Sequence, residues 1–480
     1  MSTHRRLRFV LGATALSVGA AALLAPRTAR ASGFLTDQFG SDHGHPALAN
    51  AYSVYFNPAA MAGTYGTELT LDGVVAARSL EYDRPASALS PSDPNNSAQT
   101  SNPTYQQANT GQATLFNVLA APYIGFTTDF GGSKFRLGVA SYIPFGGQVS
   151  WQKNNSYAGQ TNAPGGFDGP QRWSSISTTT SSIYETAALA YRIEALRLGV
   201  GASVSVIRTG VTDVRARNAD GSDDIFTTSG ALKEGRAQID VSGIELGAAA
   251  GVYWDATPDG ALRLGASYTS QPSFGTMRLK GTFKLQPGSL GDESTTKAEL
   301  LQAYPDVIRA GAAWRIARDA ELRLDATWQR WSVFKNQCLV EPGASCDVDS
   351  TGAPTGTGVK VNIPRDWNDS VKMRLGGAYW INPETELFGS FAYETAPVGK
   401  SHEDALTFDS TRLYGTLGVR HAFSRHVIAS LAYTYVYFVP VTVNNSAYPN
   451  SNSTTSTWPS GNGHYSSELF LFDAALSYRF

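Results

Sequence analysis

Histidine, serine and acidic residues are the side chains from which this sequence could build a metal site or a hydrolytic site. His43 and His45 have the His-x-His spacing of some metal sites, but a lone pair without further ligands is a weak signal. For His421 and His426 the sequence pattern places no serine or aspartate partner nearby, and nucleophilic catalysis requires such partners. We therefore expect a protein that is not an enzyme, with no metal site and no cofactor.

Arginines and lysines alternate with apolar residues in several segments, as in a strand with one polar and one apolar face. Between residues 369 and 382, Met373 and Leu375 fall on one register, and Lys372 and Arg374 fall on the other. If the apolar register faces lipid, the charged register faces inward, because a cation exposed to lipid at mid-bilayer costs about 2–4 kcal/mol. The same argument places these arginines inside a barrel: Arg309, Arg323, Arg374, Arg412 and Arg420.

The period of two recurs in fourteen segments, which are joined alternately by very short and by long connections. In barrels of the outer membrane, short turns lie on the periplasmic side and long loops lie outside. The sequence therefore predicts an all-β protein, a fourteen-stranded antiparallel transmembrane β-barrel. The predicted strands are 66–82, 115–129, 134–152, 173–193, 196–216, 235–254, 260–285, 303–316, 320–336, 369–382, 384–399, 411–423, 427–445 and 465–480.

The composition agrees with a barrel and argues against a set of soluble domains. Charged residues make up 16% of the chain, against about 25% in ordinary soluble proteins. Glycine, with 47 residues, and aromatic residues, at 11%, are plentiful. The formal net charge of −2 gives no indication of nucleic-acid binding. No linker divides the chain into the domains of about 100–200 residues that a soluble protein of this length would have.

Residues 1–31 have the features of a secretory signal peptide. A basic stretch precedes the apolar run 9–25, and Ala29 and Ala31 form an A-x-A cleavage signal. The alternative is a membrane-anchoring helix, but the apolar run is shorter than the about 20 residues that span a bilayer. We expect export, cleavage near Ser32 and a mature protein in the outer membrane.

Residues 32–65 precede the first predicted strand and are too polar to cross lipid. They can form a periplasmic tail or an N-terminal plug inside the barrel, and their composition does not decide between the two. A barrel of fourteen strands is wide enough to need filling unless it is an open pore. We assign residues 32–65 to a hatch, or plug, and residues 66–480 to the barrel.

The predicted third strand is irregular, because it contains Pro144, Phe145, Gly146 and Gly147. Proline cannot donate to a β-ladder, and glycine marks bulges or bends. The sequence predicts a kink in the barrel wall at this point. Missing ladder bonds are costly in lipid, so they indicate a wall that is open or backed by the hatch. An ordinary bulge near the barrel rim is the alternative.

The two cysteines, Cys338 and Cys346, lie in a stretch rich in glycine, proline and threonine. An exported chain meets an oxidising periplasm, so we expect a disulfide that closes a small surface loop. Two free thiols are the alternative. No histidine lies near them, which argues against a metal site.

Several short motifs resemble, in their order along the chain, those of the long-chain fatty acid outer-membrane transporter family (FadL/TodX type, OMPP1). Ser32-Gly33-Phe34 resembles the mature start of that family, and Asn57-Pro58-Ala59 resembles the NPA motif of its plug. Similar motifs follow at 305–306, 328–334 and 374–376, and at 393–398 with Glu and Ala in place of the family's Asp and Ser. Each motif alone is weak, but the ordered set covers nearly the whole mature chain.

The resemblance implies a barrel plugged by an amino-terminal hatch. Hydrophobic ligands would be captured between outer loops, pass to an inner pocket and leave sideways beside the third-strand kink. It implies that Phe34 reaches into the ligand pocket. A transporter of this type needs positive groups for a carboxylate head, and Arg309, Arg374 and Arg412 are candidates. For each arginine, an ion pair across the lumen is the alternative role.

We therefore expect passive transport of long-chain fatty acids or hydrocarbons across the outer membrane. The expected partners are this hydrophobic ligand and outer-membrane lipid, with no nucleic acid, and we expect a monomer. A diffusion porin for polar solutes would share the barrel but have a periplasmic tail in place of the plug. A surface adhesin would use the long loops to bind partners.

Overall fold

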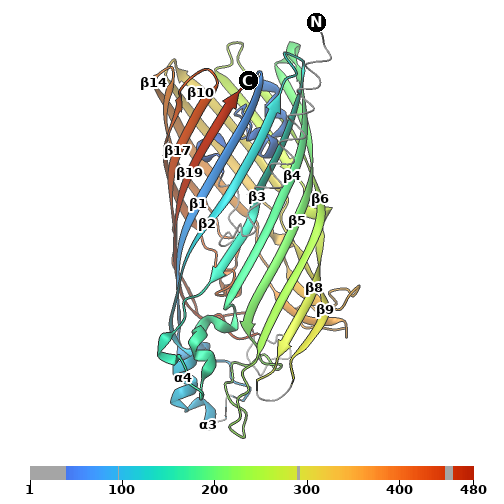
Figure 1. Ribbon diagram of the computed structural model, residues 1–480, viewed down its shortest axis with the longest axis vertical. Helices are drawn as coiled ribbons and strands as arrows, with labels where there is room; N and C mark the ends of the chain where they lie inside the picture. Colours follow the sequence, from blue (N-terminus) through green and yellow to red (C-terminus); the bar gives the residue numbers. More distant parts are fainter. Residues whose placement is uncertain (1–38, 94, 96, 289–291, 449–457) are drawn as a thin grey trace.

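Antiparallel strands wrap the chain into a closed barrel in the computed structural model, which describes residues 39–93, 95, 97–288, 292–448 and 458–480. β1 (Thr67–Arg84) pairs with β2 (Gly111–Thr128) on one edge and with β19 (Gly463–Arg479), the last strand, on the other (Figure 1). Because the last strand joins the first, the sheet closes on itself and has no terminal edge strand. The predicted signal peptide and Phe34 lie outside the described residues.

The described residues form nineteen strand segments in one sheet, and five barrel strands are each interrupted once. The interrupted strands consist of the segments β7–β8, β9–β10, β11–β12, β13–β14 and β17–β18, so the predicted fourteen-stranded antiparallel barrel is confirmed. The other segment bounds are β3 (Phe135–Ser150), β4 (Ser177–Ile193), β5 (Leu198–Ala216), β6 (Arg236–Asp255), β7 (Leu262–Thr269), β8 (Thr276–Gln286), β9 (Ser294–Ala303), β10 (Val307–Ala317), β11 (Ala320–Gln329), β12 (Asn336–Val340), β13 (Val359–Pro364), β14 (Ser370–Asn382), β15 (Thr385–Glu394), β16 (Arg412–Ala422), β17 (Val427–Phe438) and β18 (Val441–Val443).

The helices are short and lie in the segment before β1 and in the connections. Among the described residues, no helix has the length and the apolar character needed to cross a membrane. The helices are α2 (Ser53–Phe56), α3 (Ser97–Thr100), α4 (Pro103–Asn109), and the 3-10 helices η1 (Ser41–His43), η2 (Pro58–Gly63), η3 (Ala86–Ala88), η4 (Asn155–Tyr157), η5 (Pro164–Asp168), η6 (Pro170–Trp173), η7 (Glu194–Leu196), η8 (Pro272–Phe274), η9 (Trp331–Val333) and η10 (Lys400–His402).

The alternation of side chains sorts the two faces of the barrel as predicted. On β16, Leu417 is 73% exposed on the outer face, whereas Arg412 is buried on the inner face. On β14, Met373 and Leu375 are exposed, and the neighbouring Arg374 forms an ion pair inside the barrel. These strands therefore present apolar side chains to lipid and polar groups to the lumen.

The connections divide the barrel into a short-turn end and a long-loop end. Figure 1 shows the carboxy-terminus at the short-turn end, and α3 and α4 at the opposite, long-loop end. The predicted strands leave residues 286–302 and 337–368 as long loops, and this prediction is wrong in part. β9 and β13 lie there and extend the wall toward the long-loop end. Exposed residues of β9 such as Lys297 are polar, so no apolar face revealed the strand.

A disulfide closes a small loop at the long-loop end. The sulfur atoms of Cys338, on β12, and Cys346 are bonded, and their Cα atoms lie 5.9 Å apart. The loop folds back over the sheet, so that Cys338, Val340 and Leu301 of β9 are buried together.

Candidate functional site

The hatch segment, residues 39–65, lies inside the barrel toward the short-turn end, where η2 contacts strands β3 to β7. Asn57 of the NPA motif caps η2, because its Oδ1 accepts a hydrogen bond from Ala59 N at 3.1 Å. Its Nδ2 donates to Pro46 O at 2.8 Å and to Val252 O on β6 at 2.9 Å. Asn57 therefore ties two parts of the hatch segment to each other and to the wall.

The wall carries glycines where the NPA motif packs against it. A Cβ at Gly201 on β5 would lie 2.6 Å from Ala59 N, and a Cβ at Gly251 on β6 would lie 2.1 Å from Asn57 Oδ1. Only glycine permits so close an approach of two backbones. Pro58 and Ala59 are buried at this contact, and Pro58 fits the first helical position because it lacks an N–H group.

Arg374, the first of the predicted ligand-binding arginines, contacts the hatch segment. Its Nη1 donates to Ser41 O at 3.0 Å and its Nη2 donates to Gly44 O at 2.6 Å. Its Nε donates to Asp325 of β11 at 2.6 Å, which is an ion pair across neighbouring strands. Arg374 therefore joins the wall to the beginning of the hatch segment.

Arg309 and Arg412 lie in two different places. Arg309 is 1% exposed, and its Cζ lies 4.3 Å from the centre of the Tyr55 ring in the hatch segment. Arg412 lies toward the long-loop end, where its guanidinium is 3.0 Å from Glu394 and 3.0 Å from Asp409. The structure thus does not bring the three predicted arginines together, and Phe34 lies outside the described residues.

A cavity lies in the lumen between the hatch segment and the long loops. We call it the lumen cavity. Most of its lining is apolar and comes from strands on several sides of the barrel and from the loop before β16. The apolar lining includes Val149, Val211, Ile239, Phe283, Leu339 and Phe408. Such walls suit the hydrocarbon part of a ligand.

Two arginines at the end of β5 supply positive charge to the lumen cavity. Arg215 forms an ion pair with Asp213, and its Cζ lies 4.3 Å from the centre of the Trp458 ring. Arg215 Nη1 and Trp458 Nε1 are buried and have no hydrogen-bond acceptor among the described residues. These donors face a cavity in which an acceptor on a ligand could satisfy them.

Arg217 also lines the lumen cavity and forms no ion pair within the described part of the chain. Burial and the positive charge of Arg215 lower the pKa of Arg217 to about 10, so it is charged at neutral pH. Neither residue was among the predicted ligand-binding arginines: Arg215 lies at the end of the predicted strand 196–216, and Arg217 lies just beyond it. The available signal was their spacing, since residues two apart at a strand end share one face.

Asp409 joins the lumen cavity to Arg412. It lines the cavity, and its carboxylate pairs with the Arg412 guanidinium. Burial raises the pKa of Asp409 to about 6, an effect that Arg412 opposes and that Glu394 reinforces. Among the three predicted arginines, Arg412 is therefore the one that lies beside the cavity.

The predicted kink in the third strand interrupts the barrel wall. The β3–β4 register shifts between Tyr142 and Phe145, which brackets Pro144. Pairing between β2 and β3 stops at the Tyr123–Tyr142 pair, so the rest of β3 has no strand partner on its β2 side. Gly147 lines the lumen cavity. The weakened wall and the cavity therefore meet at this strand.

The gap between β2 and β3 is bridged at its far end. Asn117 Nδ2 donates to Gln148 O at 3.0 Å, and Gln152 N donates to Thr114 O at 2.9 Å. Phe145 points inward and packs near Tyr304 and Trp331, with ring centres 5.1 Å and 6.1 Å away.

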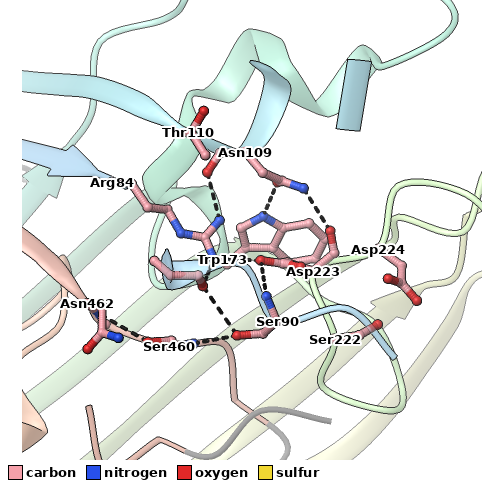
Figure 2. Close-up of polar contacts among 12 residues, drawn as sticks. Arg84, Ser90, Asn109, Thr110, Trp173, Ser222, Asp223, Asp224, Ser460 and Asn462 are labelled. Carbon is pink, nitrogen blue, oxygen red and sulfur yellow. Dashed lines mark hydrogen bonds and ion pairs between the residues drawn. The ribbon is translucent and has the colours of Figure 1, made fainter. Parts of the chain in front are cut away.

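Buried polar contacts join the long loops to one another, and together these loops form a cap over one side of the barrel. Figure 2 shows Arg84, at the end of β1, beside Asp223, and the Arg84 Nη2 to Asp223 Oδ2 distance is 2.6 Å. Asn109 Nδ2 donates to Asp223 O at 2.9 Å, and Asn109 Oδ1 accepts from Trp173 Nε1 at 2.8 Å. Ser90 Oγ accepts a hydrogen bond from the backbone N of Ser460, so the loop before β19 is also joined to the cap. These contacts are far apart in sequence, and the sequence analysis did not predict them.

Comparison with known proteins was made on sequence and on structure. The family model described as outer membrane protein transport protein (OMPP1/FadL/TodX) matches residues 22–480. The relative NMB0088 of Neisseria meningitidis serogroup B is 21% identical over 221 residues, which are 44% of this chain and 45% of that protein. The matching stretch therefore spans less than half the length of that curated relative.

Solved structures share the fold. A Pseudomonas aeruginosa FadL homologue has a TM-score of 0.72 and 17% identity, over 94% of this chain and 100% of that chain. The P. putida toluene transporter TodX has a TM-score of 0.63 and 14% identity, over 94% and 99% of the two chains. The Ralstonia pickettii toluene transporter TbuX has a TM-score of 0.56 and 15% identity, over 91% and 98%. With the family model matched over residues 22–480, the chain belongs to the outer membrane protein transport protein family, OMPP1/FadL/TodX.

Proposed function

We propose that this protein carries hydrophobic small molecules passively across the outer membrane, with long-chain fatty acids as the expected substrate class. Its family and fold are those of transport channels and not of enzymes. The observation that carries the proposal is an apolar lumen cavity whose wall holds Arg217, a half-buried cation with no carboxylate partner in the described part of the chain.

The chemistry of the lumen cavity favours an amphiphilic acid. Burial of an alkyl chain contributes about 25 cal/mol per Å² of apolar surface removed from water. A carboxylate could accept hydrogen bonds from Arg217 and from the unpaired donors of Arg215 and Trp458. A neutral hydrocarbon would leave these buried donors unsatisfied, which costs binding free energy.

A neutral aromatic hydrocarbon is the second candidate. Two solved relatives carry the name of toluene transporter, and the apolar walls of the lumen cavity suit such a ligand as well. For either ligand, the gap between β2 and β3 supports a sideways exit, because Gly147 adjoins both the gap and the cavity.

Equilibrium binding to purified protein tests the proposal. We expect oleate to bind, oleyl alcohol of the same chain length to bind at least about tenfold more weakly, and toluene to bind weakly. Tighter binding of toluene and oleyl alcohol than of oleate would favour the hydrocarbon candidate. Binding of none of the three, by a protein that shows the heat-dependent gel mobility of a folded barrel, would overturn the proposal.

A further inference from the structure

A second hollow lies between β8, β9 and β12 beside the disulfide loop. Its lining includes Arg278, Leu301, Ala303, Lys335 and Cys338. We call it the wall groove. It shares no lining residue with the lumen cavity.

The wall groove is on the outer face of the barrel. Leu300 of β9 and Leu339 of β12 line the lumen cavity, whereas Leu301 and Cys338, their neighbours in sequence, line the wall groove. Successive side chains of a strand point to opposite faces of the sheet. The groove therefore faces the surroundings of the barrel and not the path of a transported ligand.

The height of the wall groove corresponds to lipid headgroups. Thr276, at its edge, lies fourteen residues beyond Leu262, the first residue of β7 at the short-turn end. For tilted strands this is a rise of about 30 Å, just beyond an apolar band about 25 Å tall. The outward side chains below the groove are apolar: Tyr268 is 45% exposed and Phe274 is 65% exposed.

Positive charge surrounds the wall groove. Arg278 donates through Nη1 to the Glu299 carboxylate and to Ala344 O at 3.1 Å, and within the described residues Nε and Nη2 remain for a further acceptor. Lys335 is exposed and has no acidic partner among the residues that the structure describes. Lys280 is also exposed and lies opposite Glu299 in the β8–β9 register. Three cations thus face one carboxylate.

The disulfide loop builds one rim of the wall groove. Gly343 N donates to Glu299 at 3.0 Å, and Arg278 contacts Ala344 O, so the loop is docked on the outward face of β8 and β9. Cys338 and Cys346 both line the groove. The groove thus has a mixed polar and apolar lining, a covalently closed rim and two cations, Arg278 and Lys335, at its edge.

We propose that the wall groove binds the phosphate group of a lipid in the outer leaflet of the membrane. Arg278 and Lys335 bind the phosphate oxygens, because guanidinium and ammonium groups are strong donors to phosphate. The acyl chains of the same lipid extend past Phe274 and Tyr268 along the apolar band. This inference goes beyond the proposed transport function, since the groove and the lumen cavity lie on opposite faces of the wall.

Binding of lipid A to the purified protein in detergent tests the proposal. The probes are bisphosphorylated lipid A and the same lipid A after removal of both phosphates. We expect the double variant Arg278→Gln, Lys335→Gln to bind bisphosphorylated lipid A at least about tenfold more weakly than the unaltered protein. We expect the dephosphorylated lipid to bind both proteins equally weakly.

The matched control removes two exposed arginines from the short-turn end, Arg318→Gln with Arg425→Gln. This control should bind bisphosphorylated lipid A like the unaltered protein. Oleate binding by the groove variant should be unchanged, which shows an intact barrel and separates this proposal from the transport proposal. Equal binding of the phosphorylated and dephosphorylated lipids, or equal binding by the groove variant and the unaltered protein, would overturn the proposal.

Discussion

At the scale of single residues, the arginines inside this barrel fall into two groups. Arg374 and Arg412 have carboxylate partners in Asp325, Glu394 and Asp409, so their charge is compensated within the wall. Arg217 has no such partner in the described part of the chain and lines the lumen cavity. Arg217 is half-buried, and a partly desolvated cation without a carboxylate is a suitable partner for a charged ligand.

Replacing Arg217 tests this assignment. We expect Arg217→Gln to weaken oleate binding about tenfold, because a charge-assisted hydrogen bond is lost, and to change oleyl alcohol binding less than about twofold. The measurement is equilibrium binding to purified protein. Arg208→Gln is the matched control, because Arg208 lies on the same strand and is exposed on the outer face. An equal loss of binding affinity for oleate and for oleyl alcohol would show that Arg217 is not the carboxylate partner.

Asp409 should make the loop before β16 sensitive to pH. Burial raises the pKa of Asp409 from 3.8 to about 6, so the folded loop favours the protonated form. Its contribution to stability is therefore present below about pH 4 and is lost as the pH rises through 6. Glu403, in the same loop, acts in the same direction, because burial raises its pKa well above 4.5.

We expect amide hydrogens of residues 400–411 to be more protected at pH 5 than at pH 7.5, after correction for intrinsic exchange rates. The difference in opening free energy should be about 1–3 kcal/mol, since one pKa unit corresponds to about 1.4 kcal/mol. Asp409→Asn should remove a large part of this difference. Hydrogen exchange that is equally pH-dependent in Asp409→Asn would contradict the assignment.

At the scale of elements, the irregular third strand couples the wall to the lumen cavity. Pro144 and the glycines after it predict a kink from sequence, and the structure places the register shift between Tyr142 and Phe145. The loss of β2–β3 pairing could not be predicted from the sequence, because it depends on where two whole strands separate. The gap is therefore a property of the strand pair.

Cross-linking across the gap tests whether it is an exit. Asn117 on β2 and Gln148 on β3 approach each other through the hydrogen bond of 3.0 Å that bridges the gap. We expect the variant Asn117→Cys with Gln148→Cys to take up radiolabelled oleate slowly when oxidised and at the normal rate after reduction. Oleate binding should be the same in both states. Each single cysteine variant is a control. An uptake rate that is the same in the oxidised and reduced double variant would exclude this gap as the exit.

At the scale of the whole molecule, three layers lie along the barrel axis: the hatch segment, the lumen cavity and the cap of long loops. Polar contacts fix the hatch segment at points around the wall, including Asp72, Arg374 and Val252. We propose that this arrangement closes the barrel toward the short-turn end, as in a plugged transporter and unlike an open diffusion porin.

Conductance across a planar bilayer distinguishes these two possibilities. We expect the intact protein to show little or no steady conductance, and a variant without residues 39–65 to show large open channels. The heat-dependent gel mobility of a folded barrel serves as the control for the deletion. Large steady channels in the intact protein would mean that the hatch segment does not close the barrel.

The sequence by itself determined the barrel, because the alternation of apolar and polar residues indicates which face of a strand meets lipid. It also indicated the kink at Pro144, the pairing of Cys338 with Cys346 and the inward direction of Arg374 and Arg412. These features depend on the local alternation of residue types or on a chemical property of one residue. For the same reason β9 was missed, since its exposed first half, residues 294–297, is polar on both faces.

Only the tertiary structure decided which residues meet. Whether an inward arginine is compensated depends on carboxylates that are distant in sequence, and this separates Arg217 from Arg374. The ion pair of Arg84 with Asp223, and the packing of Asn57 against Gly251, join segments that no local pattern relates. The lumen cavity and the wall groove arise in the same way, because each is the space left between side chains of strands brought together by closure of the barrel.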